Sequence, residues 1–213
     1  MVSLLDRSLI RIGNRRYAAD NDSYGLTTLE ERHVEVSGAE LQFQFRGKSG
    51  QEHDISIRNR KLARVVKSCL ELPGQELFRY ETAAGDVKTV TSEDVNAYLH
   101  EVLGEAHSTK DFRTWAGTVL TAERLARAAS DPAAARHQKR ELTAAIRATA
   151  GRLGNTLAVC RSSYVHPAVS SAWLAGTFPD LWATALEEAR SGRPAELRVA
   201  EAATQNFLTA QEA

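Results

Sequence analysis

The sequence LGNTLAVCRSSY, residues 153–164, contains a glycine turn followed by a short helical segment that ends on a tyrosine. Gly154 suits the end of a helix because glycine adopts the left-handed conformation at little cost, and Asn155 or Thr156 can cap the next helix. Tyr164 lies about two and a half helical turns beyond Asn155, so the two side chains can converge only on a group placed against that second helix. A phosphodiester fits this position. The alternative is a half-buried core tyrosine whose hydroxyl meets a backbone carbonyl.

The composition is that of an ordinary globular protein. Of the 213 residues, 43% are hydrophobic and 25% are charged, with a formal net charge of zero. No apolar run approaches the roughly 20 residues that span a bilayer, and the first residues have too short an apolar region for a secretory signal. We therefore expect a cytoplasmic protein without membrane contact.

The cysteines and the distribution of charge limit which kinds of functional site the sequence can form. Cys69 and Cys160 are far apart and lack the spacing of zinc ligands, so we expect two buried hydrophobic side chains and no metal centre. The charge is uneven, which leaves a nucleic-acid partner open despite the neutral total. The basic clusters are Arg7, Arg11, Arg15 and Arg16, and then Arg58, Arg60, Lys61, Arg64 and Lys67.

The periodicity of the first half predicts a small sheet and a helix. The segments HVEV, LQFQF and HDISI within residues 33–57 alternate apolar and polar residues, which predicts an antiparallel three-stranded meander with one buried face. The preceding AADNDSYG, residues 18–25, has the composition of a loop. Residues 62–72 return to helical period, with Leu62, Val65, Val66 and Cys69 predicted to face inward.

Beyond Pro73 the pattern is helical nearly throughout. Helices are predicted over residues 92–103, 110–129, 131–153, 167–175, 179–190 and 194–210, and each of the last three has a proline at its start. Asp131-Pro132 opens the third of these, and Phe112, Trp115, Leu120 and Leu125 are expected to face inward in the second. The prediction is a single α+β domain over residues 1–213, predominantly α-helical, in which the sheet near the N-terminus precedes a helical part from about residue 60.

A tyrosine nucleophile needs cations around it. With a pKa near 10, only about one part in a thousand of a phenol is ionised at pH 7, a deficit of roughly 4 kcal/mol. Phosphoryl transfer without a metal also needs its equatorial oxygens neutralised and its leaving oxygen protonated, which arginine and lysine can do. Arg11 precedes a glycine turn, Lys48 lies at a predicted hairpin tip, and Arg113 is flanked by aromatic residues. Each of them alone also fits a surface role.

Together these residues lie in motifs that resemble those of the type IB DNA topoisomerases in their small bacterial and poxvirus-like form. The resemblance implies a catalytic set of two arginines, a lysine, a histidine or asparagine and a tyrosine, with further residues that contact the DNA backbone. The matching stretches are RIGNRRY (11–17), YGLTTLEERHVEV (24–36), FRGKSG (45–50), KDFRTWAGT (110–118) and LGNTLAVCRSSYVHP (153–167). The catalytic set maps onto Arg11, Lys48, Arg113, Asn155 and Tyr164, and the DNA contacts are expected at Tyr17 and Lys110 and at the basic residues Arg58 and Arg60.

The resemblance implies relaxation of supercoiled duplex DNA. Tyr164 would attack a backbone phosphate to give a 3′-phosphotyrosine, Arg11, Arg113 and Asn155 would bind the non-bridging oxygens, and Lys48 would protonate the 5′ oxygen. Religation would reverse the step without ATP, metal or other cofactor. We expect a monomer that is associated with the nucleoid.

Three departures from the family pattern concern the site and the chain start. Asn155 stands where several relatives have histidine, and an amide can donate a hydrogen bond but does not titrate near neutrality. Leu157 stands where proline is usual. Family members carry an additional amino-terminal segment with a small β-rich clamp, and this sequence begins just before Arg11. We therefore expect it to correspond to the carboxy-terminal part of the enzyme.

Two alternatives remain from the sequence. A tyrosine recombinase would share the fold and the nucleophile, but recombinases usually have a histidine three residues before the second arginine, where this sequence has Lys110. A non-catalytic DNA-binding remnant would keep the scaffold alone, and the complete five-residue set argues against it.

Overall fold

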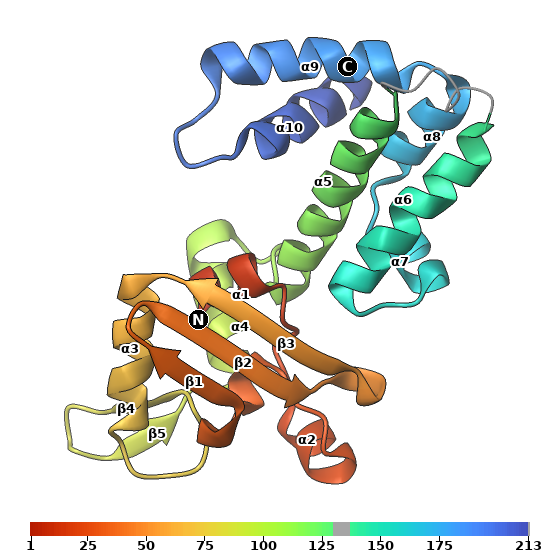
Figure 1. Ribbon diagram of the computed structural model, residues 1–213. Coiled ribbons are helices and arrows are strands. Elements are labelled where there is room, and N and C mark those ends of the chain that lie inside the picture. The colour runs from red at the N-terminus through yellow and green to blue at the C-terminus, as the bar shows by residue number, and fades with distance from the viewer. Residues whose placement is uncertain (130–136, 213) are drawn as a thin grey trace. The chain divides into compact units, whose positions relative to one another are not determined.

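The computed structural model describes residues 1–129 and 137–212. The chain divides into two compact units, Met1–Phe112 and Arg113–Ala213. The sequence predicts one domain across both units, and that assignment stays a prediction. The α+β class with a predominance of helix is confirmed (Figure 1).

The first unit carries the strands. Its helices are α1 (Val2–Ser8), α2 (Arg15–Asn21), α3 (Arg60–Leu70) and α4 (Ser92–Leu103), with the short 3₁₀ turns η1 (Leu26–Thr28), η2 (Glu31–His33) and η3 (Lys48–Gly50). Its strands are β1 (Val34–Ser37), β2 (Glu40–Arg46), β3 (Glu52–Arg58), β4 (Arg79–Glu81) and β5 (Val87–Thr89).

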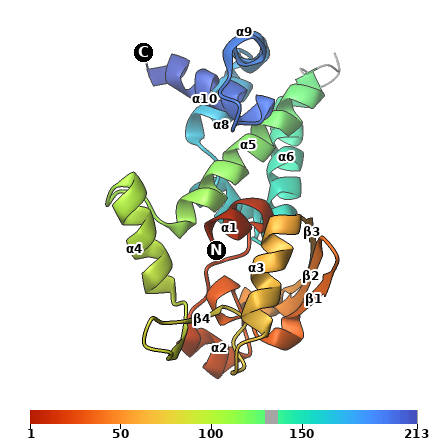
Figure 2. The same cartoon turned by 90° about the vertical axis from the view of Figure 1, so that its left-hand side faces the viewer.

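The predicted meander is confirmed as an antiparallel sheet in the order β1-β2-β3. Its buried face carries Leu41, Phe43 and Phe45 from alternate positions of β2, as the period of two requires. Helices α1 and α3 lie on this face (Figure 2). On the opposite face Gln42 donates a hydrogen bond to Asp54 at 2.9 Å. The sheet therefore has one apolar and one polar side.

Helix α3 starts two residues earlier than its apolar pattern indicates. Asn59 caps it by accepting a hydrogen bond from the backbone N–H of Leu62 at 3.0 Å. The buried residues are Ala63 and Val66, whereas Val65, which was predicted to face inward, is 52% exposed. Successive side chains of a helix point about 100° apart around its axis, so when Val66 faces the sheet Val65 does not.

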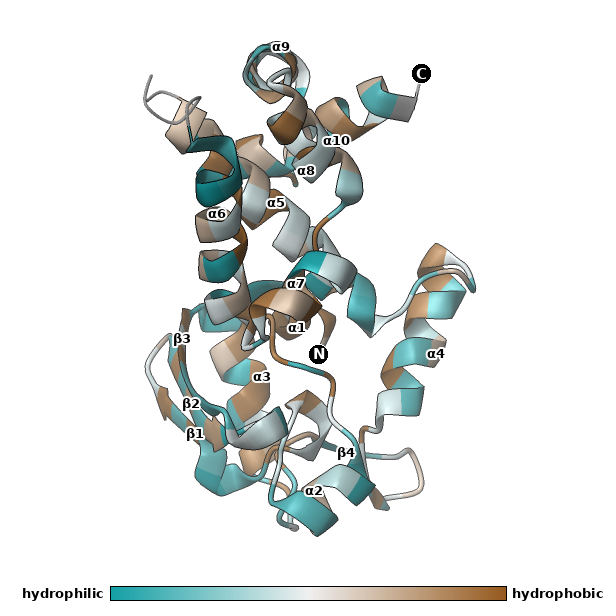
Figure 3. Cartoon of the chain, turned by 90° about the vertical axis from the view of Figure 1, so that its right-hand side faces the viewer, coloured by the Kyte–Doolittle hydropathy of each residue, from teal (hydrophilic) through white to brown (hydrophobic). Residues whose placement is uncertain are grey.

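The predicted loop at residues 18–25 is partly wrong because α2 occupies its first half. Asn14 starts this helix by accepting a hydrogen bond from the backbone N–H of Tyr17 at 3.1 Å. The helix has no buried residue, and Figure 3 shows it as largely hydrophilic. Without an apolar face it leaves no helical period in the sequence.

The helical prediction after Pro73 is also wrong in one place, where β4 and β5 form an antiparallel pair. Arg79 in β4 is 4% exposed and lies among the last carbonyls of α3. It donates hydrogen bonds to the carbonyls of Cys69 and Leu72 at 3.3 and 2.6 Å, and it pairs with the carboxylate of Glu31. Arg79 thus adds a charged donor to one carbonyl in the last turn of α3 and to one just beyond the helix.

The second unit is helical throughout its described residues. Helix α5 (Thr109–Ala129) begins in the first unit and continues into the second. It is followed by α6 (Gln138–Leu153), α7 (Leu157–Ser163), α8 (Pro167–Ala175), α9 (Phe178–Gly192) and α10 (Val199–Glu212). The predicted opening of α6 at Asp131-Pro132 lies outside the described residues.

Two predictions for these helices need correction. Helix α10 starts at Val199 rather than at Pro194, because Glu201 accepts a hydrogen bond from the backbone N–H of Arg198 at 2.8 Å and so caps the helix there. In α5 the predicted inward residue Leu125 is fully buried, whereas Trp115 and Leu120 are only half-buried.

An aromatic cluster forms part of the core of the second unit. The ring of Phe178 lies 5.8, 5.6 and 5.4 Å from the rings of Trp173, Trp182 and Phe207, measured between centroids. The indole N–H of Trp173 donates a hydrogen bond to the carbonyl of Gln138 at 2.9 Å. These contacts join α8, α9, α10 and the start of α6. No helix within the described ranges is long and apolar enough to cross a membrane.

Candidate active site

The second unit brings together Arg113, Asn155 and Tyr164. Arg113 lies in α5 and is 5% exposed. Its guanidinium donates a hydrogen bond to the carbonyl of Leu153 at 2.6 Å and contacts the side-chain oxygen of Asn155 at 3.5 Å. The guanidinium carbon also lies 5.4 Å from the centroid of the Tyr164 ring. These residues, which are distant in sequence, form the first of two half-sites.

The helix, turn and helix predicted at residues 153–164 are confirmed and explain how Tyr164 is presented. Gly154 ends α6 in the left-handed conformation, with φ 60° and ψ 47°. Thr156 caps α7 by accepting a hydrogen bond from the backbone N–H of Val159 at 3.3 Å. Asn155 therefore lies between the two helices, and Tyr164 terminates the short α7.

The surroundings of Tyr164 differ from those expected for a core tyrosine whose hydroxyl is hydrogen-bonded to a backbone carbonyl. Its side chain is half-buried, and within the described part of the chain its hydroxyl forms no hydrogen bond. A phenol in a structural role usually finds such a partner. The absence of one leaves the oxygen available for chemistry.

Gly117 and Thr118 of α5 hold the backbone around Tyr164. A Cβ atom on Gly117 would lie 2.3 Å from the carbonyl oxygen of Tyr164, so only glycine permits this approach. Thr118 accepts a hydrogen bond from the backbone N–H of His166 at 3.0 Å. Both residues belong to the motif KDFRTWAGT, but no pattern in the sequence assigned them this task.

Cys160 lies beneath the half-site and is fully buried. Burial raises the pKa of its thiol above the ordinary value, while the positive charge of Arg113 acts in the opposite direction. A thiol in this state is a packing group, as the sequence predicted, and so is the half-buried Cys69, whose pKa burial also raises.

Arg11, Lys48 and Tyr17 form the second half-site, which lies in the first unit. They surround a cavity of about 220 Å³, whose other walls come from the segments on either side of α2 in the chain. The full lining is Arg11, Ile12, Gly13, Asn14, Tyr17, Ser23, Tyr24 and Lys48. The cavity thus brings together Arg11 and Tyr17, from the motif at residues 11–17, and the predicted hairpin lysine Lys48.

Arg11 is held through its backbone. Its carbonyl accepts a hydrogen bond from the N–H of Leu26 at 2.8 Å, and the carbonyl of Ile12 accepts one from the N–H of Thr27 at 2.7 Å. A Cβ atom on Gly25 would lie 2.5 Å from the Cα atom of Gly13, so the two segments approach each other at a glycine pair. The motifs at residues 11–17 and 24–36 are therefore parts of one structure.

Lys48 lies in the loop between β2 and β3, at the predicted hairpin tip. The loop closes through a hydrogen bond of 2.7 Å from the N–H of Gly47 to the carbonyl of Gln51. Within it, Ser49 has a φ of 64°. A Cβ atom on Gly47 would lie 2.6 Å from the imidazole of His53, which packs the loop against the sheet.

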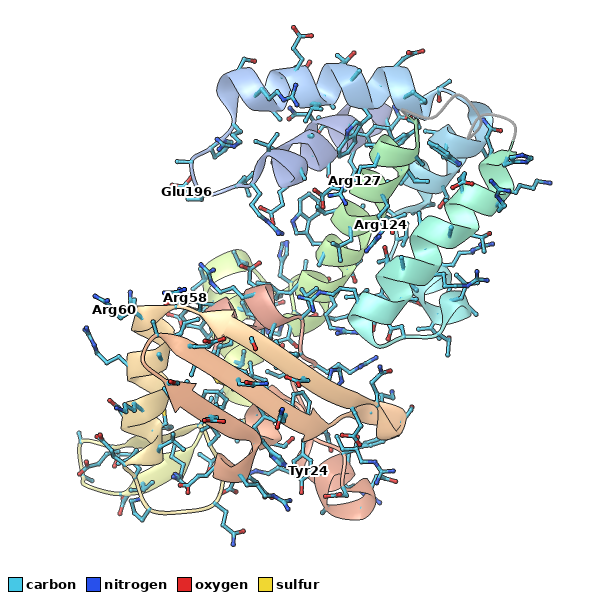
Figure 4. The ribbon with its side chains drawn as sticks, viewed as in Figure 1. Tyr24, Arg58, Arg60, Arg124, Arg127 and Glu196 are labelled. Carbon is cyan, nitrogen blue, oxygen red and sulfur yellow. The ribbon has the colours of Figure 1, made fainter. Side chains whose placement is uncertain are left out.

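The other predicted DNA contacts do not line this cavity. Arg58 ends β3 and Arg60 begins α3, and both are exposed (Figure 4). Lys110 is exposed in the first turn of α5. Their proposed contacts with DNA stay predictions.

Sequence reasoning missed Tyr24 as a wall of the cavity. Its hydroxyl accepts a hydrogen bond from Arg32 at 2.9 Å, and its ring lies 4.3 Å from the ring of His33. Arg32 also pairs with Glu30 at 2.7 Å. The available signal was an aromatic residue directly before Gly25 in a motif that was otherwise identified. No group of three or more potential metal ligands occurs across residues 1–129 and 137–212.

Comparison with known proteins is consistent with this arrangement. Residues 1–172 match the family described as eukaryotic DNA topoisomerase I, catalytic core. DNA topoisomerase 1B of Acanthamoeba polyphaga mimivirus is 32% identical over 162 residues, which cover 73% of this chain and 48% of the viral protein. DNA topoisomerase 1B of Vaccinia virus (strain Copenhagen) and DNA topoisomerase I of Monkeypox virus are each 35% identical over 63 residues, 30% of this chain and 19% of theirs.

The chain thus spans about half the length of the mimivirus relative. The family match nevertheless covers most of the chain and includes the motifs of both half-sites. From these matches, the chain belongs to the type IB DNA topoisomerase family.

Proposed function

We propose that this chain cleaves and reseals one strand of duplex DNA through Tyr164 and thereby relaxes supercoils. The observation that carries the proposal is the buried guanidinium of Arg113, which the carbonyl of Leu153 holds next to the Tyr164 ring. Arginine presents a planar set of donors that matches the oxygens of a phosphate. A cation fixed in this way favours the charged transition state.

The cleavage step exchanges one phosphodiester for another. The phenolic oxygen of Tyr164 forms a bond to phosphorus as the bond from phosphorus to the 5′ oxygen breaks. The phenolic proton passes to solvent, and Lys48 gives a proton to the departing 5′ oxygen. In religation the 5′-hydroxyl attacks phosphorus and gives its proton to Lys48, while the bond from phosphorus to the phenolic oxygen breaks and the phenolate takes a proton from solvent. Because bond energy is conserved, the cycle needs no ATP, and the cationic side chains neutralise the charge that a metal ion would otherwise neutralise.

The non-bridging oxygens require donors that are in place before the reaction. Arg113 and Asn155 supply them from the second unit, and Arg11 supplies a further guanidinium from the first. Preorganised donors of this kind contribute about 3 to 4 kcal/mol each in related oxyanion sites.

The test is relaxation of negatively supercoiled plasmid by the 213-residue chain in EDTA, together with trapping of a covalent adduct on a nicked oligonucleotide. We expect relaxed topoisomers and one protein molecule attached to the 3′ end of the cut strand. An adduct on the 5′ end would overturn the mechanism. An adduct that resolves only by joining two different duplexes would favour a recombinase, and binding without an adduct would favour a non-catalytic remnant.

A further inference from the structure

The ammonium group of Lys48 lies over an aromatic ring. Its nitrogen is 5.9 Å from the centroid of the Tyr17 ring, at the outer limit of a cation–π contact. Both residues line the cavity that contains Arg11, and both line a second cavity of about 300 Å³. The pair is therefore part of the wall that Arg11 shares.

The positions of the two backbones are independently determined. Tyr17 stands in the first turn of α2, where its N–H is bonded to the cap residue Asn14. The backbone at Lys48 is set by the closed loop from Gly47 to Gln51. The lysine side chain, by contrast, has four flexible carbons and is exposed. Within the described residues Lys48 forms no ion pair, so the Tyr17 ring is the contact that orders its charged end.

We propose that Tyr17 is a positioning residue that acts through its ring by holding the ammonium group of Lys48 for proton donation. The inference rests on the proposed function, in which Lys48 is the general acid. It assigns Tyr17 a task different from a hydroxyl contact with the DNA backbone. The ring face attracts the cation electrostatically, and the phenolic oxygen is not required for that attraction.

A DNA strand in which sulfur replaces the bridging 5′ oxygen distinguishes the two possible tasks of Tyr17, which are to position Lys48 or to contact the DNA backbone. The departing thiol has a pKa near 8.5, so it leaves without a proton and makes Lys48 unnecessary. A residue that acts through Lys48 becomes dispensable on this strand. A residue that binds the phosphate remains necessary, because the non-bridging oxygens are unchanged.

The experiment measures single-turnover cleavage of the ordinary and the sulfur-containing strand by Tyr17→Leu, Tyr17→Phe and Lys48→Ala. We expect Tyr17→Leu to cleave ordinary DNA about two- to fivefold more slowly, as the loss of an exposed cation–π contact implies. On the sulfur strand it should match wild type. Tyr17→Phe keeps the ring, so the sulfur strand should speed its cleavage by no larger factor than it speeds that of wild type. In a Lys48→Ala background, Tyr17→Leu should add no further loss.

The matched control is Tyr98→Leu, since Tyr98 is 54% exposed and Tyr17 is 53% exposed, both in the first unit. It should cleave both strands at the wild-type rate. The proposal is overturned if Tyr17→Leu is equally slow on both strands, because that result indicates a phosphate contact, or if the sulfur strand rescues Tyr17→Phe as it rescues Lys48→Ala, because the ring alone would then not hold the lysine. It is equally overturned if Tyr17→Leu is faster than wild type, since the ring would then hold the lysine away from the reaction.

A measurement without DNA separates this proposal from the proposed function. The ring current of Tyr17 should shift the NMR signals of the Lys48 ε-methylene protons upfield in wild type and in Tyr17→Phe, but not in Tyr17→Leu. An unshifted wild-type signal overturns the contact. A wild-type chain that forms no covalent adduct overturns the proposed function instead, and the NMR shift then decides on the contact alone.

Discussion

Tyr164 can be tested by the loss of one oxygen atom. Tyr164→Phe removes the nucleophile and no charge, and it leaves the contact between the ring and Arg113 in place. We expect strand cleavage to be abolished while duplex binding stays within about twofold of wild type. Gel-shift titration and adduct trapping on the same oligonucleotide measure the two quantities. Covalent adduct at the wild-type level in the variant would show that another residue is the nucleophile.

Arg113 should affect cleavage and religation equally, because one transition state serves both directions. Arg113→Ala removes a buried donor, and we expect both rates to fall about 10²- to 10³-fold. Arg113→Lys keeps the charge but loses the planar donor set, so it should remain slow. Rapid-quench measurements of both directions test this, with thermal unfolding as the control for folding. A change in binding affinity alone would contradict the role.

The sequence was sufficient to propose the charged and nucleophilic residues of the site but not the residues that hold them in place. Arg113, Asn155 and Tyr164 are chemically informative in themselves and lie in identifiable motifs. Gly117 and Tyr24 are not, because their importance depends on how closely another backbone or ring approaches them. Such distances depend on the packing of helices and loops and leave no periodic pattern.

The packing of α5 on the segment after α7 can be tested at Gly117. A Cβ atom there would lie 2.3 Å from a backbone oxygen of Tyr164, so Gly117→Ala must displace one of the two segments. We expect the free energy of unfolding to fall by about 1 to 3 kcal/mol and cleavage to slow. Urea unfolding and single-turnover cleavage measure these effects.

Gly151→Ala in α6 is the matched control. No atom lies within 4 Å of a Cβ built on Gly151, and the residue is exposed within its helix. Alanine there should raise the free energy of unfolding by about 0.5 to 1 kcal/mol and leave cleavage unchanged. If both variants behaved alike, the effect at residue 117 would be one of helix propensity and the close approach would be irrelevant.

Elements with an apolar face were predictable and elements without one were not. The meander and α8 came directly from apolar spacing and from Pro167. Helix α2 has no buried residue, and the cap residue Asn14 is the sequence signal that indicates it. Strands β4 and β5 have three residues each, which is too short for alternation to be distinguished from a helical pattern. Local turn and cap chemistry, and not apolar periodicity, therefore determines α2 and the β4–β5 pair.

Stability of the chain as a whole should depend on pH through His33. Burial lowers the pKa of its imidazole below the ordinary 6.5, and the charge of Arg32 lowers it further. Its Nδ1 atom accepts a hydrogen bond from the N–H of Glu30 at 3.0 Å, which requires that nitrogen to be unprotonated. As the pH falls through 6.5, the unfolded chain takes up this proton before the folded chain does. The free energy of unfolding should therefore decrease, by at most about 1.4 kcal/mol per pH unit.

Urea titrations between pH 5 and pH 8 test this dependence. His33→Gln does not titrate, so its stability should vary less with pH than that of wild type across the same range. The slope of the free energy of unfolding against pH should differ least between the two proteins above pH 7, where His33 is neutral in both the folded and the unfolded chain. Parallel curves for the two proteins at every pH would show that other groups dominate the dependence.

The shorter of the two hydrogen bonds described for Arg113 runs to a carbonyl of the main chain, at Leu153. Every amino acid has that group, so genetic drift at residue 153 between aliphatic side chains of similar size leaves the guanidinium's partner intact. An arginine held by an aspartate could lose its partner in a single codon change, and the buried charge would then lack compensation. The hydrogen bond to residue 153 therefore persists through such substitutions, whereas the contact with the side chain of Asn155 can be lost by a single mutation.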